Sequence, residues 1–177
     1  MPANASSAAH DRRVTSEPRR EIRVHVAELV AATSGMLVTI GLGSCVAIAL
    51  YDPDAHVAGL AHILLPSENL SRDRSNPAKF PSTAIPLLMR EMCDRGARPE
   101  RIRATIIGGA SMFANLIPNG GINIGERNIA AVRASLATLS VPIVAEDTGS
   151  DYGRSVYFHV DDGRVEVRSL RKGSRVL

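Results

Sequence analysis

The sequence has no tryptophan, and aromatic residues make up only 3% of its 177 residues. It has two cysteines, Cys45 and Cys93, too few for a disulfide framework or a cysteine-rich zinc site. No apolar run reaches the roughly 18 residues that a membrane-spanning helix needs. No apolar stretch follows the N-terminal charges as it would in a secretory signal. These absences predict a cytoplasmic protein without membrane insertion, in which both thiols are free.

Motifs for common ligands are also missing. No GxxxxGK[ST] loop is present, and no G-x-G-x-x-G opens a helix after a strand, which argues against nucleotide binding. Histidines, cysteines and carboxylates do not cluster at metal-ligand spacing. The net charge of +3 is concentrated at the chain ends, which favours solubilising ends over a nucleic-acid surface. We therefore expect no cofactor, no metal and no nucleic-acid partner.

The composition otherwise suits one folded domain. Hydrophobic residues make up 45% and charged residues 22%, ordinary values for a globular protein. Residues 1–20 are rich in Ala, Ser and charge and lack apolar periodicity, which predicts a disordered N-terminal tail. A single domain is expected over residues 21–170, because no internal repeat or linker divides them. A basic C-terminal tail is expected over residues 171–177.

Apolar periodicity and turn signals predict more strands than helices. Strands are expected over residues 23–29 (where a helix is also possible), 37–40, 46–51, 57–65, 102–107, 141–145, 155–160 and 164–168. One helix is expected from residue 82 or 83 to about 95 and a second ending near 139, with a long polar loop over 67–81. Because the first strands join by a tight hairpin rather than a crossover, the pattern favours an α+β fold.

The hairpin after the run Thr39-Ile40-Gly41-Leu42-Gly43-Ser44-Cys45 brings a cysteine toward a histidine. Asp52-Pro53-Asp54-Ala55 has the sequence of a type I turn. That turn would pair Tyr51 with His56 and place Cys45 opposite His62 on the same face. Opposed Cβ atoms lie roughly 4.5 to 5.5 Å apart, close enough for the imidazole to approach the sulfur. A slip of one residue would put the two side chains on opposite faces.

A thiol beside an imidazole is suited to nucleophilic catalysis. An imidazolium can stabilise the thiolate and later protonate a leaving group. Backbone N–H groups around Gly43, Ser44 and Cys45 can hold an oxyanion if the bend turns them inward. Thr39, across the bend, is a candidate to orient the ring of His62. The spacing alone favours the structural alternative, in which Cys45 is a small core residue and His62 a satisfied strand histidine.

The motifs themselves resemble those of the CheD family of chemoreceptor glutamine deamidases, over about residues 22 to 170. The resemblance begins with the run from Thr39 to Ala47 and continues in Gly59-Leu60-Ala61-His62-Ile63-Leu64-Leu65-Pro66. Later matching segments are Gly108-Gly109-Ala110-Ser111-Met112-Phe113, Ile124-Gly125-Glu126-Arg127-Asn128, Asp147-Thr148-Gly149 and Gly153-Arg154. The sequence departs from the family at Ser150, where a second glycine is usual, and at Lys79-Phe80-Pro81-Ser82, where a tyrosine is usual.

The resemblance implies a cytoplasmic protein-glutamine glutaminase that converts specific glutamines of methyl-accepting chemotaxis receptors to glutamate and releases ammonia through a cysteine thioester. Family roles fall on Cys45 as nucleophile, His62 as acid and base, and Thr39 as the orienting residue. The implied fold is a layered α/β sandwich with mixed, largely antiparallel sheets and helices packed outside, similar to the catalytic domain of the cytotoxic necrotizing factor toxins. A CheC-type phosphatase is an implied partner. The alternative is a weakly catalytic module that modulates such a phosphatase.

Overall fold

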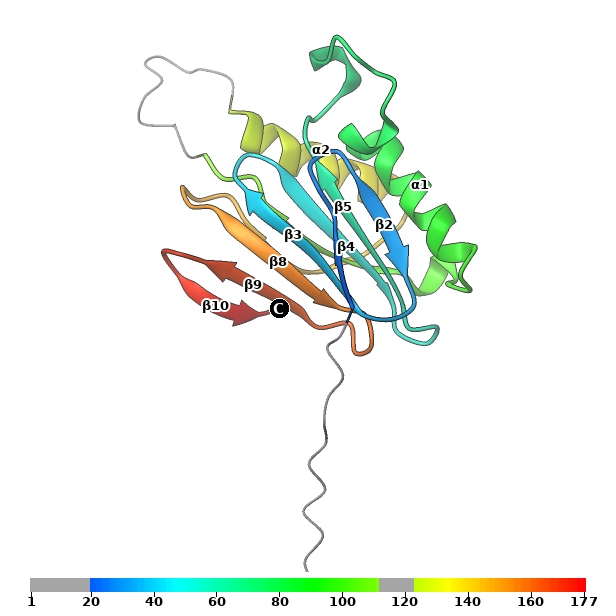
Figure 1. The fold of residues 1–177 in the computed structure, drawn as a ribbon. Coiled ribbons are helices and arrows are strands. Elements are labelled where there is room, and N and C mark those ends of the chain that lie inside the picture. The colour runs from blue at the N-terminus through cyan, green and yellow to red at the C-terminus, as the bar shows by residue number, and fades with distance from the viewer. Residues whose placement is uncertain (1–19, 112–122) are drawn as a thin grey trace, which may run out of the picture.

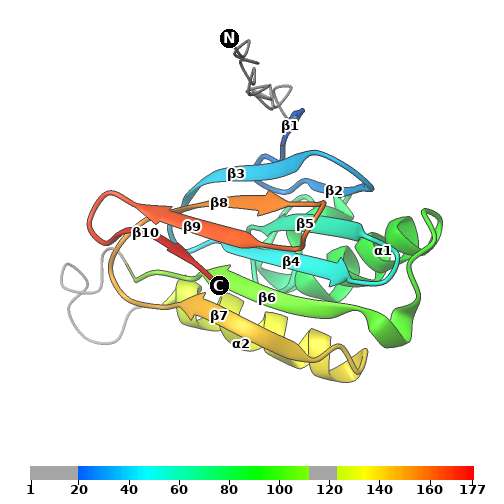
Figure 2. The ribbon, with the colours of Figure 1, turned by 90° about the horizontal axis from the view of Figure 1, so that it is seen from below.

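The computed structural model describes residues 20–111 and 123–177, and these residues form three layers (Figures 1 and 2). Two five-stranded sheets lie face to face, and two helices cover the outer face of one of them. The strands are β1 (Glu21–Arg23), β2 (Leu29–Ala32), β3 (Met36–Leu42), β4 (Val46–Asp52), β5 (Val57–Ile63), β6 (Arg103–Gly108), β7 (Ile143–Thr148), β8 (Arg154–His159), β9 (Val165–Ser169) and β10 (Gly173–Val176). The helices are α1 (Pro81–Cys93) and α2 (Ile124–Thr138), with short 3-10 turns η1 (Glu68–Leu70), η2 (Pro77–Lys79) and η3 (Pro99–Arg101).

The first sheet has the order β1-β3-β8-β9-β10 and the second the order β2-β5-β4-β6-β7. Within the described residues the strand pairings are antiparallel except β1–β3 and β6–β7, which are parallel. The α+β layered sandwich with mixed, largely antiparallel sheets and outer helices is therefore confirmed.

The central strands of the second sheet, β5, β4 and β6, are buried on both faces, and the sequence of β4 shows why. In β4, Val46, Ile48 and Leu50 face the helices, and Ala47 and Ala49 face the first sheet. A strand covered on both sides needs apolar residues at every position, so the run over residues 46–51 shows no alternation. The space between the two sheets holds the second apolar core, and the candidate site lies at one end of that space.

The prediction of one strand over residues 23–29 is wrong. The chain instead makes β1, turns at residues 24–28 and enters β2, so the two strands belong to different sheets. Ala27 takes a left-handed backbone conformation with φ of 59°, which breaks the extended chain. The alternation of valines around His25 resembles a strand but spans this turn.

The two chain ends were expected to be tails. Residues 1–19 lie outside the described part of the chain. Residues 171–177 contain β10, which pairs with β9 from Gly173 to Val176 and completes the first sheet. All four residues of β10 are exposed, so no apolar alternation marks this strand in the sequence.

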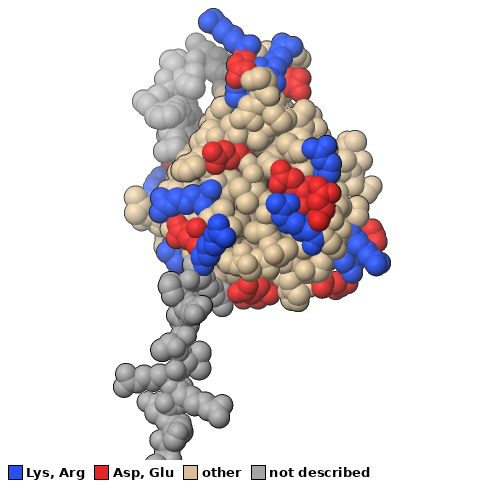
Figure 3. Space-filling model, turned by 45° about the vertical axis from the view of Figure 1, so that its right-hand side comes forward, with Lys and Arg blue, Asp and Glu red and all other residues tan. Residues whose placement is uncertain are grey.

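The described helices do not include one long and apolar enough to cross a membrane. On the face that Figure 3 shows, basic and acidic side chains are interspersed among broad uncharged areas. That face therefore presents a mixed charge pattern rather than one sign.

Candidate active site

The β4–β5 hairpin has a different register from the one the turn sequence predicts. His62 pairs with Ala47 rather than with Cys45, and Tyr51 pairs with Ala58. The predicted pairing is thus wrong by two residues along the partner strand. Because side chains alternate with a period of two, this shift leaves Cys45 and His62 on the same face.

The cause of the shift is the loop that closes the hairpin. Asp52 stays in β4 as its last residue, and its carboxylate accepts the N–H groups of Asp54 and Ala55. His56 takes a left-handed conformation with φ of 50°. The loop therefore spans residues 53–56, two residues more than the central pair of the predicted type I turn.

The three predicted catalytic residues all face the space between the sheets. Cys45 packs against the apolar core between the sheets, which also contains Ala47, the pairing partner of His62. Thr39 lies on β3 opposite Val156, another member of that core. Thr39 and His62 are each only 1% exposed, whereas Cys45 is half-buried. The site is thus an inward-facing cluster reached from the Cys45 side.

A hydrogen bond across the two sheets joins Thr39 to His62. The distance from Thr39 Oγ1 to His62 Nδ1 is 2.7 Å. The other ring nitrogen, Nε2, is buried and has no hydrogen-bond partner among the described residues. In the tautomer in which Nδ1–H donates to the Thr39 hydroxyl, Nε2 carries a free lone pair. That lone pair is what a general base requires.

Cys45 is close to His62 but is not hydrogen-bonded to it in the described structure. It precedes β4 by one residue, so it is a diagonal neighbour of His62 across the hairpin. Diagonal positions are roughly 7–8 Å apart at the backbone, within reach of a histidine side chain. Catalytic hydrogen bonds are often long before substrate binds, so this arrangement suits a site that closes around its substrate.

Burial favours the neutral forms of both Cys45 and His62. Desolvation lowers the pKa of His62 to about 4, with a smaller electrostatic contribution from His25. Desolvation also raises the pKa of the Cys45 thiol, partly offset by its own backbone N–H. At neutral pH the resting pair is therefore a thiol and an imidazole, whereas the sequence suggested a thiolate and an imidazolium.

The bend before Cys45 is held by hydrogen bonds from one side. Three consecutive carbonyl oxygens of the bend each accept a bond of 2.7 to 2.8 Å. The three pairs are Gly43 O with Ala110 N, Ser44 O with Asn128 Nδ2, and Cys45 O with Gly109 N. A Cβ on Gly108 would lie 2.4 Å from the Cys45 oxygen, so this close approach requires a glycine.

Asn128 contacts the bend, a role that our sequence analysis missed although the residue stands in one of the family motifs. It is fully buried in the first turns of α2, and its Nδ2 donates to Ser44 O at 2.8 Å and to Leu64 O at 3.1 Å. Its Oδ1 is buried without a partner among the described residues, a situation that costs about 1–3 kcal/mol. Its spacing of four residues from buried Val132 is the sequence signal that could have shown an amide on the inward face.

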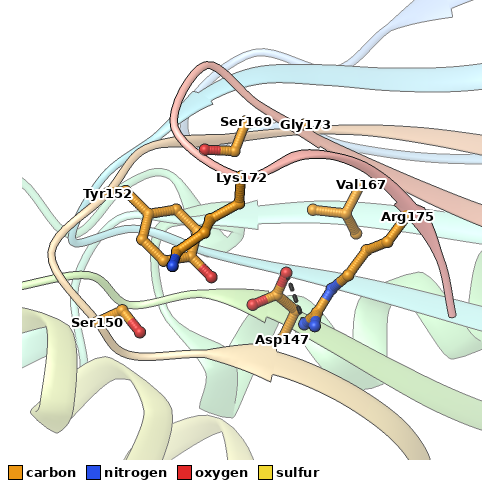
Figure 4. Close-up of a pocket in the computed structure, with 8 residues that line it drawn as sticks. All are labelled: Asp147, Ser150, Tyr152, Val167, Ser169, Lys172, Gly173 and Arg175. Carbon is orange, nitrogen blue, oxygen red and sulfur yellow. Dashed lines mark ion pairs between the residues drawn. The ribbon is translucent and has the colours of Figure 1, made fainter.

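A polar cavity of about 430 Å³ lies elsewhere, between β7 and the β9–β10 end of the first sheet (Figure 4). Cys45, His62 and Thr39 do not line it. Asp147 forms an ion pair with Arg175 in this cavity. The remaining lining residues are Ser150, Tyr152, Val167, Ser169, Lys172 and Gly173.

Among residues 20–111 and 123–177, no three His, Cys, Asp or Glu side chains gather closely enough to hold a metal ion. The chemistry available at the site is therefore that of the thiol, the imidazole, the hydroxyl and the backbone around them.

Comparison with known proteins gives consistent results. The family model described as CheD chemotactic sensory transduction matches residues 64–169. The "Probable chemoreceptor glutamine deamidase CheD" of Caldanaerobacter subterraneus subsp. tengcongensis is 48% identical over 157 residues, which cover 88% of this chain and 97% of that protein. The protein of the same name from Moorella thermoacetica is 46% identical over 160 residues, covering 89% and 96%. Among solved structures, the Bacillus licheniformis hypothetical protein YfiH aligns at 17% identity with a TM-score of 0.42 over 68% of this chain and 49% of that one, too weak to establish a shared fold.

Proposed function

Because the chain belongs to the CheD family of chemoreceptor glutamine deamidases, we propose that Cys45, His62 and Thr39 are its catalytic residues. The activity is hydrolysis of glutamine side-chain amides on chemotaxis receptors, which yields glutamate and ammonia. The observation that carries the residue assignment is the bond from His62 Nδ1 to Thr39, which leaves Nε2 free on the face that Cys45 shares.

The first half of the proposed reaction forms a thioester. His62 Nε2 takes the proton of the Cys45 thiol while the sulfur attacks the glutamine Cδ. The carbonyl oxygen becomes an oxyanion, and the backbone N–H groups of the Gly43–Cys45 bend stabilise it. The His62 imidazolium then gives its proton to the amide nitrogen, the C–N bond breaks and ammonia leaves. Cys45 is now acylated, and His62 is neutral again.

The second half regenerates the thiol. His62 Nε2 takes a proton from water as the water oxygen attacks the thioester carbon. The C–S bond then breaks, and the imidazolium returns the proton to the Cys45 sulfur. The products are glutamate and free enzyme. Thr39 holds the ring in the tautomer that both halves require, because its hydroxyl accepts the Nδ1 proton.

The starting charge state follows from burial. A resting ion pair would place two charges in a poorly solvated space, whereas a neutral pair develops charge only when substrate fills the site. The lowered pKa of His62 and the raised pKa of Cys45 both support this order of events. Proton transfer is thus part of the attack rather than a step before it.

Several features beyond the chemistry belong to the same proposal. We place the enzyme in the cytoplasm, with residues 21–170 as one catalytic domain, to whose first sheet β10 adds its last strand, and a fold similar to that of the cytotoxic necrotizing factor catalytic domain. The loop over residues 67–81 leads from the end of β5 to α1 and is our candidate for contacts with the receptor. A CheC-type phosphatase is the proposed regulatory partner.

The decisive experiment is ammonia release from a purified receptor cytoplasmic fragment. Removing the nucleophile in Cys45→Ala should lower the rate by about 10⁴-fold or more. Cys93→Ala is the matched control, because Cys93 is also a free, half-buried thiol but lies at the end of α1. Equal release by wild type and Cys45→Ala would contradict the catalytic assignment. Unmodified receptor glutamines by mass spectrometry, together with tight phosphatase binding, would favour the alternative module.

A further inference from the structure

We propose that Asn128 is a positioning residue that sets the oxyanion site, because its amide holds the carbonyl of Ser44 and thereby aims the N–H of Cys45 at the substrate. This inference rests on the proposed function and adds to it a residue on α2. The evidence is the pattern of hydrogen bonds around the nucleophile bend, residues 43–45.

The direction of the amide groups follows from peptide geometry. In a trans peptide the C=O of one residue and the N–H of the next point in opposite directions. Gly43 O and Ser44 O both point toward residues of the 108–110 loop and α2. The N–H groups of Ser44 and Cys45 must therefore point away from these elements. In the part of the chain that the structure describes, neither N–H donates to another residue.

Of the three donors that hold the bend, only Asn128 donates from a side chain, because the other two donors are backbone amides. Loss of its Nδ2 would free the Ser44 carbonyl, and the peptide that carries the Cys45 N–H could then rotate. The neighbouring peptides would stay held by Ala110 N and Gly109 N. Loss of the Asn128 amide should therefore misplace only one donor of the oxyanion site, the N–H of Cys45.

Asn128 also ties the bend to the strand that carries the base. Its second Nδ2 proton goes to Leu64 O, two residues beyond His62. The reversed orientation is excluded, because Oδ1 would then face two carbonyl oxygens. The Oδ1 of the same amide is buried without a partner among the described residues, so Asn128 bears a desolvation cost on one atom while its Nδ2 serves two backbone carbonyls.

The base of this clamp is rigid. A Cβ on Gly125 would lie 2.5 Å from Gly109 O, so α2 packs directly on the backbone of the 108–110 loop. A Cβ on Gly109 would lie 2.4 Å from Cγ1 of Ile129. Contacts this close leave α2 little freedom to move toward the bend, so another side chain at position 128 could not recover the same geometry by a small shift.

The test compares Asn128→Ala with Val132→Ala in the full-length protein. Both residues are fully buried on α2 one turn apart, so both variants remove core packing, but of the two only Asn128 hydrogen-bonds to the bend. Steady-state ammonia release from the receptor fragment gives kcat and KM. The rate of Cys45 alkylation by iodoacetamide gives the reactivity of the thiol in a displacement that develops no oxyanion. Both are measured well below each variant's Tm.

We expect Asn128→Ala to lower kcat by about 10- to 100-fold with little change in KM, as expected for a misplaced oxyanion donor. Its alkylation rate should stay within about twofold of wild type, because the thiol needs no oxyanion donor for that reaction. Val132→Ala should keep kcat within about twofold, since it loses packing but no hydrogen bond to the bend.

Three results would overturn the inference. The first is an unchanged kcat in Asn128→Ala, and the second is an equal fall in kcat for Val132→Ala. The third is a parallel fall in deamidation and alkylation, which would mean that Asn128 places the thiol instead. If wild-type protein released no ammonia, the proposed function itself would fail, and the inference with it. An active wild type with an active Asn128→Ala would leave the function standing and remove only the role of Asn128.

Discussion

Two polar clusters bridge the sheets of this protein, and they are built in opposite ways. Thr39 on β3 meets His62 on β5, and Arg154 on β8 meets Asp147 on β7. The first cluster is neutral and leaves one nitrogen of His62 buried without a partner among the described residues. The second is ionic, and Arg154 bonds through all three of its nitrogens. The second carboxylate oxygen of Asp147 is paired with Arg175.

The difference indicates that the first cluster is suited to catalysis and the second to holding the two sheets together. A fully paired buried ion cluster fixes how two elements dock, because every donor and acceptor is already committed. A buried group left unpaired costs stability, and it is retained where the free atom has a task. The polar cavity of Figure 4 lies beside the ionic cluster of Asp147 and Arg154. The unpaired nitrogen, His62 Nε2, belongs to the neutral cluster. This criterion supports the proposal that the reaction takes place at Thr39 and His62 rather than in the polar cavity.

The largest effects expected from changing these two clusters are a loss of activity at the first and a loss of stability at the second. The double variant Thr39→Val, His62→Leu removes the base and should lower kcat by at least about 10³-fold. Because both partners are replaced by apolar groups, the free energy of unfolding should change by only about 1 kcal/mol. Arg154→Leu leaves Asp147 buried with only Arg175 and should lower the free energy of unfolding by about 3 kcal/mol or more. Urea denaturation and ammonia release measure the two quantities.

These two variants form each other's control. The double variant should stay folded and inactive, while Arg154→Leu should lose far more stability than the double variant does. If the double variant unfolded and Arg154→Leu did not, the assignment of the clusters would be reversed.

The next effect is a dependence of stability on pH. The pKa of His62 is about 4 in the fold, below the ordinary value of about 6.5. As pH falls below 6.5, His62 binds a proton in the unfolded chain, whereas in the fold it does not accept one until about pH 4. The contribution of His62 to the free energy of unfolding is therefore complete above pH 6.5 and is lost as pH falls from 6.5 to 4. The loss from this residue should be about 3 kcal/mol. The difference between the free energies of unfolding of wild type and His62→Leu, measured at each pH, isolates the contribution of this residue. An identical pH dependence in both proteins would rule that contribution out.

The sequence allowed much of the site to be predicted, because strand periodicity decides which face a side chain occupies. Cys45 and His62 share a face at any register shift of two residues, so that inference survived the error. The register itself depends on distant partners, since Arg98 N and Arg101 hold the Asp52 carboxylate that ends β4. Asn128 acts across 84 residues to reach Ser44, a distance that no local pattern encodes.

The smallest effects concern the partner that orients or neutralises the central group of each cluster, Thr39 beside His62 and Arg175 beside Asp147. In Thr39→Val the ring of His62 loses the acceptor for Nδ1–H, and the proton can move to Nε2, where it blocks the base. We expect kcat to fall by about 10-fold or more, with recovery in Thr39→Ser, which keeps the hydroxyl. Arg175→Ala removes a half-exposed partner from Asp147 and should cost about 1 kcal/mol or less, with kcat unchanged. A silent Thr39→Val, or a Thr39→Ser as slow as Thr39→Val, would show that the 2.7 Å bond does not select the tautomer.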